Sequence, residues 1–491
     1  MKKLRKWVLD ELAQLTKKKV FGEKTVEETM PALCRKAAAE SAVLLKNENH
    51  VLPFDKIHPI AVFGRVQLDW FYVGYGSGGD VNPPYTINLI EGLQNAGITL
   101  DKHLLHTYTQ WSASNRPSMG FWGRWPRYFE EMPWDEQQIK AAADRCDTAL
   151  IVIGRAAGES RENTLEPGSY YLTQEEKNLL SRVTATFRHT VVVINAGSIM
   201  DLSWLENYPI EGALLLWQGG MESGSAAADV LTGKKDACGR LTDTIAYRYE
   251  DYPSAKDFLG QDYNFYTEDI YVGYRYFETF APEAVQFPFG FGLSYTTFSL
   301  ENITVTPHGD KAFVKATVRN TGSRPGKDVV QVYVEPPQGK LGKPLRNLVQ
   351  FQKTHLLQPG EHQTITLPFP LGAAASYDDS GVTGHRSAWV LEAGDYRIYV
   401  GENVRAASLV GSIPVSETRV LLQLEETCPP SPLHPFQRLV NQNGQKVYEP
   451  VPTATRSLKQ RILGNLPEEI PFTGDKGITL QNVALGLVPL E

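Results

Sequence analysis

Short, uninterrupted apolar runs alternate with amphipathic segments through the first half of this sequence, and this alternation limits the fold more than any other feature. Such runs are typical of strands that are buried on both faces of a parallel sheet. The amphipathic segments would then form helices that cover the two faces. The predicted strands are residues 59–64, 148–154, 190–196 and 212–218, and the predicted helices are residues 26–46, 86–96, 172–187 and 220–233. The pattern predicts a three-layer α/β sandwich with a mostly parallel sheet over residues 26–245.

A different pattern, in which apolar and polar residues alternate, begins after residue 298. This period of two is typical of strands that are buried on one face, as in antiparallel sheets. The predicted strands are residues 312–320, 328–335, 361–369 and 393–401. We therefore expect an antiparallel β-sandwich over residues 299–418. Residues 246–298, between the two domains, are dense in aromatic residues and glycine without a helical or strand period, and we interpret them as a packing segment.

The two ends of the sequence predict no further complete domain. Residues 1–25 begin with the basic residues of a signal peptide, but Asp10 and Glu11 interrupt the apolar core that such a peptide needs. We interpret these residues as an amphipathic helix. Residues 419–491 contain a proline-rich linker and then a stretch too short to form a domain of its own.

Composition argues against several classes of partner. Lys plus Arg total 49 against 56 for Asp plus Glu, so the net charge is −7 and no basic excess is left to bind nucleic acid. The longest apolar runs are far shorter than the roughly 20 residues of a membrane-spanning helix, so we expect no membrane segment. The four cysteines, at positions 34, 146, 238 and 428, are widely spaced and form no CxxC pair. We interpret them as reduced thiols of a cytoplasmic protein.

A glycine-rich loop, GYGSGGD (74–80), follows the first predicted strand and precedes a helix. The glycine spacing is not GxGxxG, and the loop lacks the GK[ST] ending of a nucleotide-binding loop, which argues against a nucleotide. Two interpretations remain: a tight structural turn, or a loop that presents Ser77 and Asp80 to a polar ligand. The second is favoured because open α/β sheets bind ligands at the carboxyl ends of their strands.

A second loop, GRAAGESREN (154–163), follows the next predicted strand and contains Glu159. A carboxyl group on such a loop could act as a general acid if partial burial raised its pKa. The alternative is that Glu159 and Glu162 are solvated loop charges. A retaining glycosidase needs two carboxylates about 5 to 5.5 Å apart, and this loop offers one plausible member of such a pair.

Other candidate sites are weaker. His103 and His106 are three residues apart, but two histidines without a third ligand are more often surface or capping residues, so we expect no metal site. The sequence AGSIM around Ser198 is not the GxSxG turn of a serine hydrolase. No motif indicates an organic cofactor.

Several longer motifs occur in order between about residues 30 and 420. They are AAAESAVLLKNENHVLPF (37–54), GYGSGGDV, ALIVIGRAAGE, VVVINAGSIMDLSWL, WQGGMESGSAAADVLTGKKDACGRLTDTI, YVGYRYFE and FPFGFGLSYTTF. This ordered set resembles glycoside hydrolase family 3. The resemblance implies an α/β sandwich followed by a fibronectin type III-like domain. This domain order resembles the circularly permuted β-glucosidases of the family, in which the catalytic barrel comes last.

The resemblance also implies a retaining mechanism, in which an Asp from the barrel attacks the anomeric carbon and a Glu from the α/β sandwich protonates the leaving oxygen. That Glu corresponds to Glu159, and the serine of the family's glycine-rich loop that approaches the sugar corresponds to Ser77. The SDW-type context of the nucleophile and the sugar-binding KH pair of the barrel have no counterpart in this sequence. The final GDKGITLQNVALG resembles the opening of the barrel, so most of a barrel is expected to be missing from these 491 residues.

The implied function is that of a β-glucosidase-like hydrolase of terminal β-D-glucosyl residues, of which this chain supplies the acid/base half. The chain alone is expected to show little or no turnover, because an acid without its nucleophile cannot form the glycosyl-enzyme intermediate. The expected partners are a β-glucoside or oligosaccharide substrate and a barrel-domain partner chain. The alternative is a non-catalytic carbohydrate-binding or structural interaction module. An uncovered barrel-facing surface further predicts homo-oligomers or poor solubility for the isolated chain.

Overall fold

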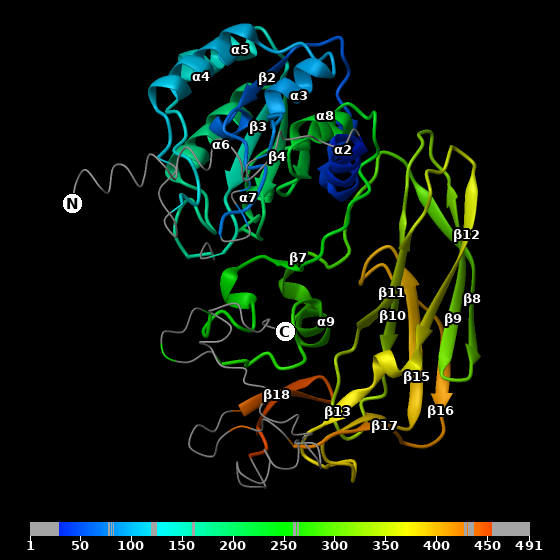
Figure 1. Cartoon of the computed structure of the whole chain (residues 1–491). Coiled ribbons are helices and arrows are strands. Elements are labelled where there is room, and N and C mark those ends of the chain that lie inside the picture. The colour runs from blue at the N-terminus through cyan, green and yellow to red at the C-terminus, as the bar shows by residue number, and fades with distance from the viewer. Residues whose placement is uncertain are drawn as a thin grey trace, which may run out of the picture.

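The computed structural model describes residues 29–76, 79, 81, 83–118, 125–159, 163–258, 262, 265–426, 430 and 437–453 (Figure 1). The helix predicted for residues 1–25 and the barrel opening predicted near the end of the sequence lie outside this part of the chain. Within the described part, an α/β domain is followed by an antiparallel β-sandwich, which confirms the fold class predicted from the sequence.

A five-stranded sheet forms the centre of the α/β domain. Its strands are β1 (Val43–Asn47), β2 (Ile60–Phe63), β3 (Thr148–Arg155), β4 (His189–Ala196) and β5 (Gly212–Leu215). They lie in the order β1-β5-β4-β3-β2, and β2, β3, β4 and β5 pair in parallel. β1 pairs antiparallel with β5 at one edge. The carboxyl ends of the four parallel strands therefore share one edge of the sheet.

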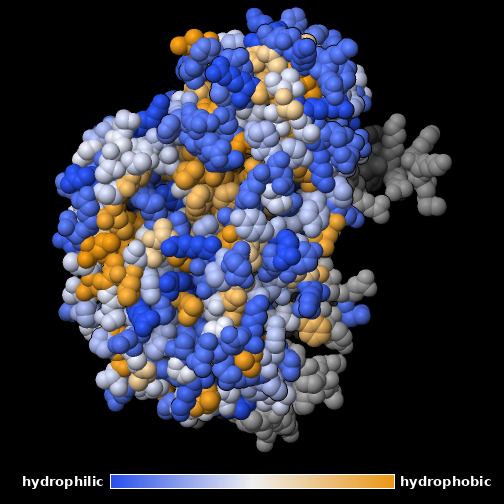
Figure 2. All heavy atoms as spheres, turned by 180° about the vertical axis from the view of Figure 1, so that it is seen from behind, coloured by the Kyte–Doolittle hydropathy of each residue, from blue (hydrophilic) through white to orange (hydrophobic). Residues whose placement is uncertain are grey.

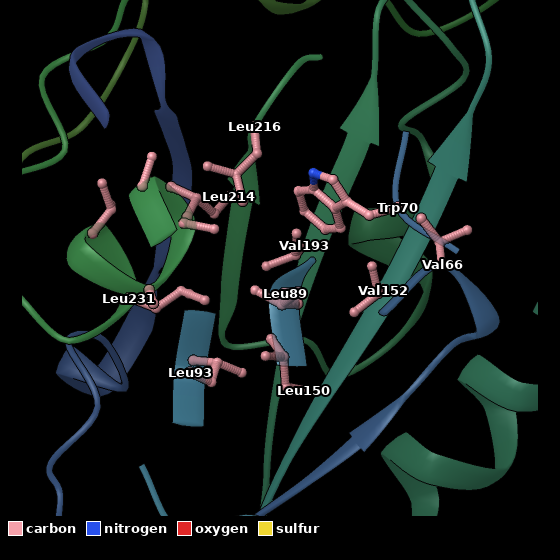
Figure 3. Packing of buried hydrophobic residues seen from close by; sticks show 14 of the residues in the cluster. Val66, Trp70, Leu89, Leu93, Leu150, Val152, Val193, Leu214, Leu216 and Leu231 are labelled. Atoms are coloured by element: carbon pink, nitrogen blue, oxygen red, sulfur yellow. The ribbon is translucent and has the colours of Figure 1, made fainter. Parts of the chain in front are cut away.

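Helices cover both faces of this sheet because its strands are apolar on both sides. One face packs against α2 (Thr29–Ser41), α3 (Leu89–Asn95) and α8 (Ser223–Leu231). The other face packs against α4 (Lys102–Ser114), α5 (Glu136–Ala143), α6 (Gln174–Thr186) and α7 (Trp204–Asn207). In β3, Leu150 and Val152 belong to the first core and Ile151 and Ile153 to the second, as the strand period of two requires. Figure 3 shows the first core, where side chains of α3 and α8 meet those of the sheet.

The first predicted helix is too long at its C-terminal end. The pattern predicts a helix to residue 46, whereas α2 ends at Ser41 and Val43 begins β1. Periodicity alone could not separate the two, because the leucines of this segment fit either a helix face or a strand buried on both faces. The alternation is visible in the structure: Val43 and Leu45 enter one core, and Leu44 enters the other. Pairing with β5 supplies the hydrogen bonds that fix the strand.

The second domain is a sandwich of two antiparallel sheets. One sheet has the order β11-β10-β15-β16 and the other β12-β9-β8. Their strands are β8 (Phe298–His308), β9 (Lys311–Asn320), β10 (Val329–Glu335), β11 (Asn347–Lys353), β12 (His362–Pro370), β15 (Gly394–Gly401) and β16 (Ser408–Val415). A third, smaller sheet consists of β13 (Ser376–Asp378), β14 (Ala388–Leu391) and β17 (Arg419–Gln423). The alternating residues of the two large sheets meet in a single core.

The aromatic segment between the domains contains a short helix that the sequence analysis did not predict. This helix, α9 (Tyr274–Phe280), lies near the short strands β6 (Ile245–Ala246) and β7 (Val285–Phe287). Its length of 7 residues gives too few turns for an apolar period to be recognised. Within this segment Tyr271 and Phe277 are buried, whereas Tyr266 is 81% exposed.

Ion pairs join the α/β domain to the β-sandwich, which lies alongside it (Figure 1). Arg240 donates to Asp328 at 2.6 Å, and Lys327 donates to Glu40 of α2 at 2.5 Å. Both Arg240 and Asp328 are largely buried, so this pair is shielded from solvent screening. These ion pairs lie at the boundary between the two domains.

The region predicted as a linker after residue 418 contains strands. Besides β17, it forms the hairpin β18 (Gln437–Gln442) and β19 (Gln445–Pro450). The turn residues Asn443 and Gly444 both have positive φ, of 54° and 82°, as a two-residue hairpin turn requires. An Asn-Gly pair between two stretches in which apolar and polar residues alternate is typical of a hairpin. The prolines in the flanking sequence led to the prediction of a linker instead.

No helix among the described residues is long and apolar enough to cross a membrane. Figure 2 shows apolar side chains in several separate groups on the back face of the molecule, with charged and polar side chains between them. The association predicted from the sequence stays a prediction.

Candidate active site

Two loops meet at the carboxyl edge of the sheet, and they are the two loops singled out in the sequence. The glycine-rich loop follows β2 and the short helix η2 (Arg65–Gln67), and the loop with Glu159 follows β3 directly. The Tyr75 N–H donates to the Ala157 carbonyl at 2.8 Å, and the Glu159 N–H donates to the Tyr75 carbonyl at 3.0 Å. These two hydrogen bonds extend the parallel pairing beyond the ends of β2 and β3 and set Glu159 beside the glycine-rich loop.

Glycines make this close approach sterically feasible. Gly158 has a φ of +131°, and a Cβ there would lie 2.1 Å from the Tyr75 carbonyl oxygen. Gly76 has a φ of +114°, and a Cβ there would lie 2.3 Å from the Cβ of Glu159. A side chain at either position would strain the backbone and push the loops apart. The glycine-rich loop therefore packs against Glu159, which the sequence did not show.

The predicted site residues have different outcomes. Glu159 is exposed in the described structure. Partial burial was the condition set for an acid role, and the exposure of Glu159 does not meet it in the described structure. Ser77 and Asp80 lie outside the described residues, and their predicted contacts with a ligand stay predictions.

Asn195 holds the chain segment that leads to the glycine-rich loop, although it was not among the residues predicted from the sequence. It is fully buried at the end of β4. Its side chain accepts from the Phe71 N–H at 2.9 Å and donates to the carbonyls of Phe71 at 2.9 Å and Trp217 at 2.6 Å. The residue thus ties the connections after β2 and β5 to β4. A polar residue at the carboxyl end of an otherwise apolar strand was the available signal.

Aromatic side chains from a second segment pack against the glycine-rich loop. The rings of Tyr75 and Trp125 stack at 5.5 Å with an interplanar angle of 2°, and those of Phe71 and Phe129 stack at 4.7 Å. A cavity of about 290 Å³ opens beside them, lined in part by Trp70, Phe71 and Tyr75. These contacts hold the rings of Phe71 and Tyr75 in place, but the spacing of Trp125 and Phe129 in the sequence gave no indication of them.

Arg155, the last residue of β3, anchors the start of the Glu159 loop. It is buried and donates to both carboxylate oxygens of Glu176 at 2.7 Å. It also donates to the carbonyls of Ser169 at 3.0 Å and Tyr171 at 3.2 Å. Through these bonds one guanidinium holds β3, the start of α6 and the segment between them together.

A buried carboxyl group, Glu131, holds the connection that leads from β2 to the glycine-rich loop. It accepts from the Arg65 N–H at 2.6 Å, the Tyr108 hydroxyl at 2.8 Å and the Met132 N–H at 2.9 Å. Burial raises the pKa of Glu131 from 4.5 to about 7, against the opposing effect of these donors. The group therefore titrates near neutral pH in the folded protein.

We expect Glu131 to make stability depend on pH. Between pH 4.5 and 7 the folded protein keeps a proton on Glu131 that the unfolded chain has released. The stabilisation is therefore complete below about pH 4.5 and is lost as the pH rises to about 7, by about 3 kcal/mol at 1.36 kcal/mol per pKa unit. Urea unfolding gives the free energy of unfolding of the wild type and of Glu131→Gln at each pH. The difference between these two free energies should change by this amount across the range. Glu130→Gln, at the exposed neighbouring position, should show no such change, and a constant difference for Glu131→Gln would contradict the prediction.

The described residues contain no group of three or more His, Cys, Asp or Glu side chains placed to bind a metal. His103 and His106 lie on α4, away from the loops at the carboxyl edge of the sheet. The described site thus consists of a carboxylate, a glycine-rich loop and aromatic side chains. A carboxylate of this kind can donate or accept a proton, and it needs a second group to form a covalent intermediate.

Comparison with known proteins agrees with this description. Residues 42–295 match the glycosyl hydrolase family 3 C-terminal domain, and residues 328–404 match the fibronectin type III-like domain. A β-glucosidase of Ruminococcus albus is 45% identical over 454 residues, which cover 92% of this chain and 48% of that protein. The chain spans about half the length of the curated relatives it matches.

Solved structures give the same result. A β-glucosidase from Paenibacillus barengoltzii has a TM-score of 0.88 and 43% identity, covering 95% of this chain and 53% of the other. β-Glucosidase 3B from Thermotoga neapolitana, solved with α-D-glucose, has a TM-score of 0.74 and 36% identity, covering 82% and 56%. The family 3 match alone extends over more than half of the 491 residues. The chain therefore belongs to glycosyl hydrolase family 3.

Proposed function

We propose that this chain is the acid/base half of a β-glucosidase-like enzyme that hydrolyses terminal β-D-glucosyl residues with retention of configuration. The observation that carries the proposal is the pair of hydrogen bonds between Tyr75 and the Ala157–Glu159 segment, which sets an exposed glutamate beside a glycine-rich loop. The choice of β-glucosides is supported by relatives with 45% and 43% identity that are named β-glucosidases.

In the proposed mechanism, Glu159 protonates the glycosidic oxygen as the bond to the leaving group breaks. A nucleophilic carboxylate from a barrel domain, which these 491 residues do not contain, attacks the anomeric carbon. Glu159 then removes a proton from the water that hydrolyses the glycosyl-enzyme, as the retaining mechanism requires. Ser77 and Asp80 would contact the sugar from the glycine-rich loop.

Glu159 is exposed in the described residues. This fits an enzyme in which this chain supplies the acid and a barrel domain supplies the nucleophile. A carboxyl group must hold a proton before it can protonate a leaving group. Covering it with a barrel and a bound sugar would remove water and favour the protonated form, because burial disfavours the charged carboxylate. We therefore propose that the acid becomes competent when the second half of the site is in place.

Hydrolysis of a chromogenic aryl β-glucoside tests the proposal. The 491-residue chain would be assayed alone and together with the half of the Ruminococcus albus β-glucosidase that it does not cover. We expect turnover when the two are combined and little or none from either alone. Activity of this chain alone would require a second carboxylate within it. Absence of activity in every combination would instead support a non-catalytic carbohydrate-binding or interaction module.

A further inference from the structure

A second cavity lies where the β-sandwich, the aromatic segment and the C-terminal hairpin meet, and it shares no residue with the Glu159 site. Its volume is about 290 Å³, near the lower end of the range for small-molecule sites. Tyr377 and Trp389 of the small sheet line it, together with Asp269 and Arg275 of the aromatic segment and Arg438 of β18. Cavities at such junctions are common places for ligands to bind.

The walls of this cavity are held by buried contacts. Leu439 of β18 packs with Tyr271 and Phe277 of the aromatic segment. The Asn441 N–H donates to the Tyr271 hydroxyl at 2.9 Å, and the Asn441 side chain donates to Gln338 of the β-sandwich at 2.7 Å. The three parts are therefore fixed relative to one another, and a ligand would bind a preformed site.

Two large aromatic side chains remain accessible in this cavity. Trp389 is 41% exposed and Tyr377 is 38% exposed, and the two lie directly opposite each other on β14 and β13. Their ring centroids are 5.7 Å apart and their planes are tilted by 54°. The two rings thus form an angled apolar surface. Aromatic rings in this position offer a large contact area to a flat, partly apolar ligand at a low entropic cost.

The charged groups of the cavity balance once the pairing of Lys343 with Glu392 is counted. Asp269 and Asp379 provide carboxylates and Arg275 and Arg438 provide guanidinium groups, whereas Lys343, which also lines the cavity, is neutralised by Glu392. Arg438 is engaged by Asp379, whereas the side chain of Arg275 forms no hydrogen bond or ion pair with any residue in the described part of the chain. Arg275 is half-buried and keeps donors for a ligand. Asp269 has a φ of 49°, a left-handed conformation that is uncommon for a residue other than glycine.

We propose that this cavity is a second saccharide site, which binds a neutral mono- or disaccharide unit. The C–H face of a pyranose would stack on Trp389 and Tyr377. The sugar hydroxyls would accept from Arg275 and donate to Asp269 or Asp379. The balanced charge disfavours an anion or a cation, and the mixture of donors and acceptors matches hydroxyl groups, which do both. This inference rests on the cavity alone and does not depend on the proposed activity.

Calorimetric titration of the full 491-residue chain with cellobiose tests the inference. We expect saturable binding that Trp389→Ala and Arg275→Met each weaken at least tenfold. Phe351→Ala is the matched control, because Phe351 is an aromatic residue of the β-sandwich that is 60% exposed and does not line the cavity. Weaker binding by both Trp389→Ala and Arg275→Met would separate this cavity from the proposed active site, because neither residue belongs to the Glu159 loops. Circular dichroism of each variant checks that it is folded.

Three results would overturn the inference. One is the absence of cellobiose binding by the wild type, and another is equal binding by the wild type, Trp389→Ala and Arg275→Met. The third is binding of glucuronate at least tenfold tighter than glucose, which would identify an anion site instead. Failure of hydrolysis in the complementation assay would leave all three measurements unaffected.

Discussion

Glu159→Gln is expected to lower the hydrolysis of an alkyl β-glucoside by the reconstituted enzyme by about 10²- to 10⁴-fold, the usual range for loss of a general acid–base group. The same variant should cleave the glycosidic bond of a dinitrophenyl β-glucoside at a rate within about tenfold of the wild type. An alkoxide is a poor leaving group and needs the proton from Glu159, whereas a dinitrophenolate departs without it. The second step, hydrolysis of the glycosyl-enzyme, also uses Glu159, as the base. The rate of bond cleavage must therefore be taken from the burst phase, because the steady-state rate also reflects the second step.

Glu166→Gln is the matched control for this comparison. Glu166 is an exposed glutamate that follows Glu159 in the same connection between β3 and α6. We expect it to change the rate for neither substrate. Equal losses on the alkyl and dinitrophenyl substrates with Glu159→Gln would contradict its assignment as the acid and would indicate a general disturbance of the loop.

The sequence could predict the neighbourhood of Glu159 because the relevant pattern is local. Each of the two loops follows a short apolar run, and the carboxyl ends of parallel strands meet at one edge of a sheet. The pairing of Tyr75 with the Ala157–Glu159 segment depends on β2 and β3 being adjacent, which the order of strands along the chain suggests but does not fix. Only the structure shows that Gly76 packs against Glu159.

The supporting residues could not be predicted, since they come from distant segments with no common pattern. Asn195 lies at the end of β4, and Trp125, Phe129 and Glu131 belong to a stretch between α4 and α5 without a helical or strand period. Their roles arise from tertiary contacts: stacking on Tyr75 and Phe71, and acceptance of hydrogen bonds from Arg65 and Tyr108. A buried glutamate such as Glu131 is indistinguishable from the exposed Glu130 beside it until the fold is known.

Arg155→Met is expected to lower the free energy of unfolding of the α/β domain by about 3–5 kcal/mol, the range for removing one partner of a buried ion pair. Arg155 and Glu176 have side-chain exposures of 3% and 8%. Without the guanidinium, the Glu176 carboxylate would stay buried without its ion-pair partner. The Ser169 and Tyr171 carbonyls would also lose a donor. Chemical denaturation followed by far-UV circular dichroism measures the loss. Arg248→Met, which breaks the solvent-screened pair with Asp251, should lower the free energy of unfolding far less than Arg155→Met does.

The double variant Arg155→Met/Glu176→Leu separates the cost of the buried charge from the loss of packing. Replacing both members of a buried pair by apolar residues is often close to neutral, because no charge is left to desolvate. The recovery should be partial here, since Glu176 also accepts from the Thr173 N–H at 2.8 Å in the capping box of α6. We therefore expect the double variant to be more stable than Arg155→Met alone and less stable than the wild type. A double variant as unstable as Arg155→Met would contradict this expectation. It would mean that the hydrogen bonds from Arg155 to the two carbonyls, and not its ion pair with Glu176, stabilise the connection between β3 and α6.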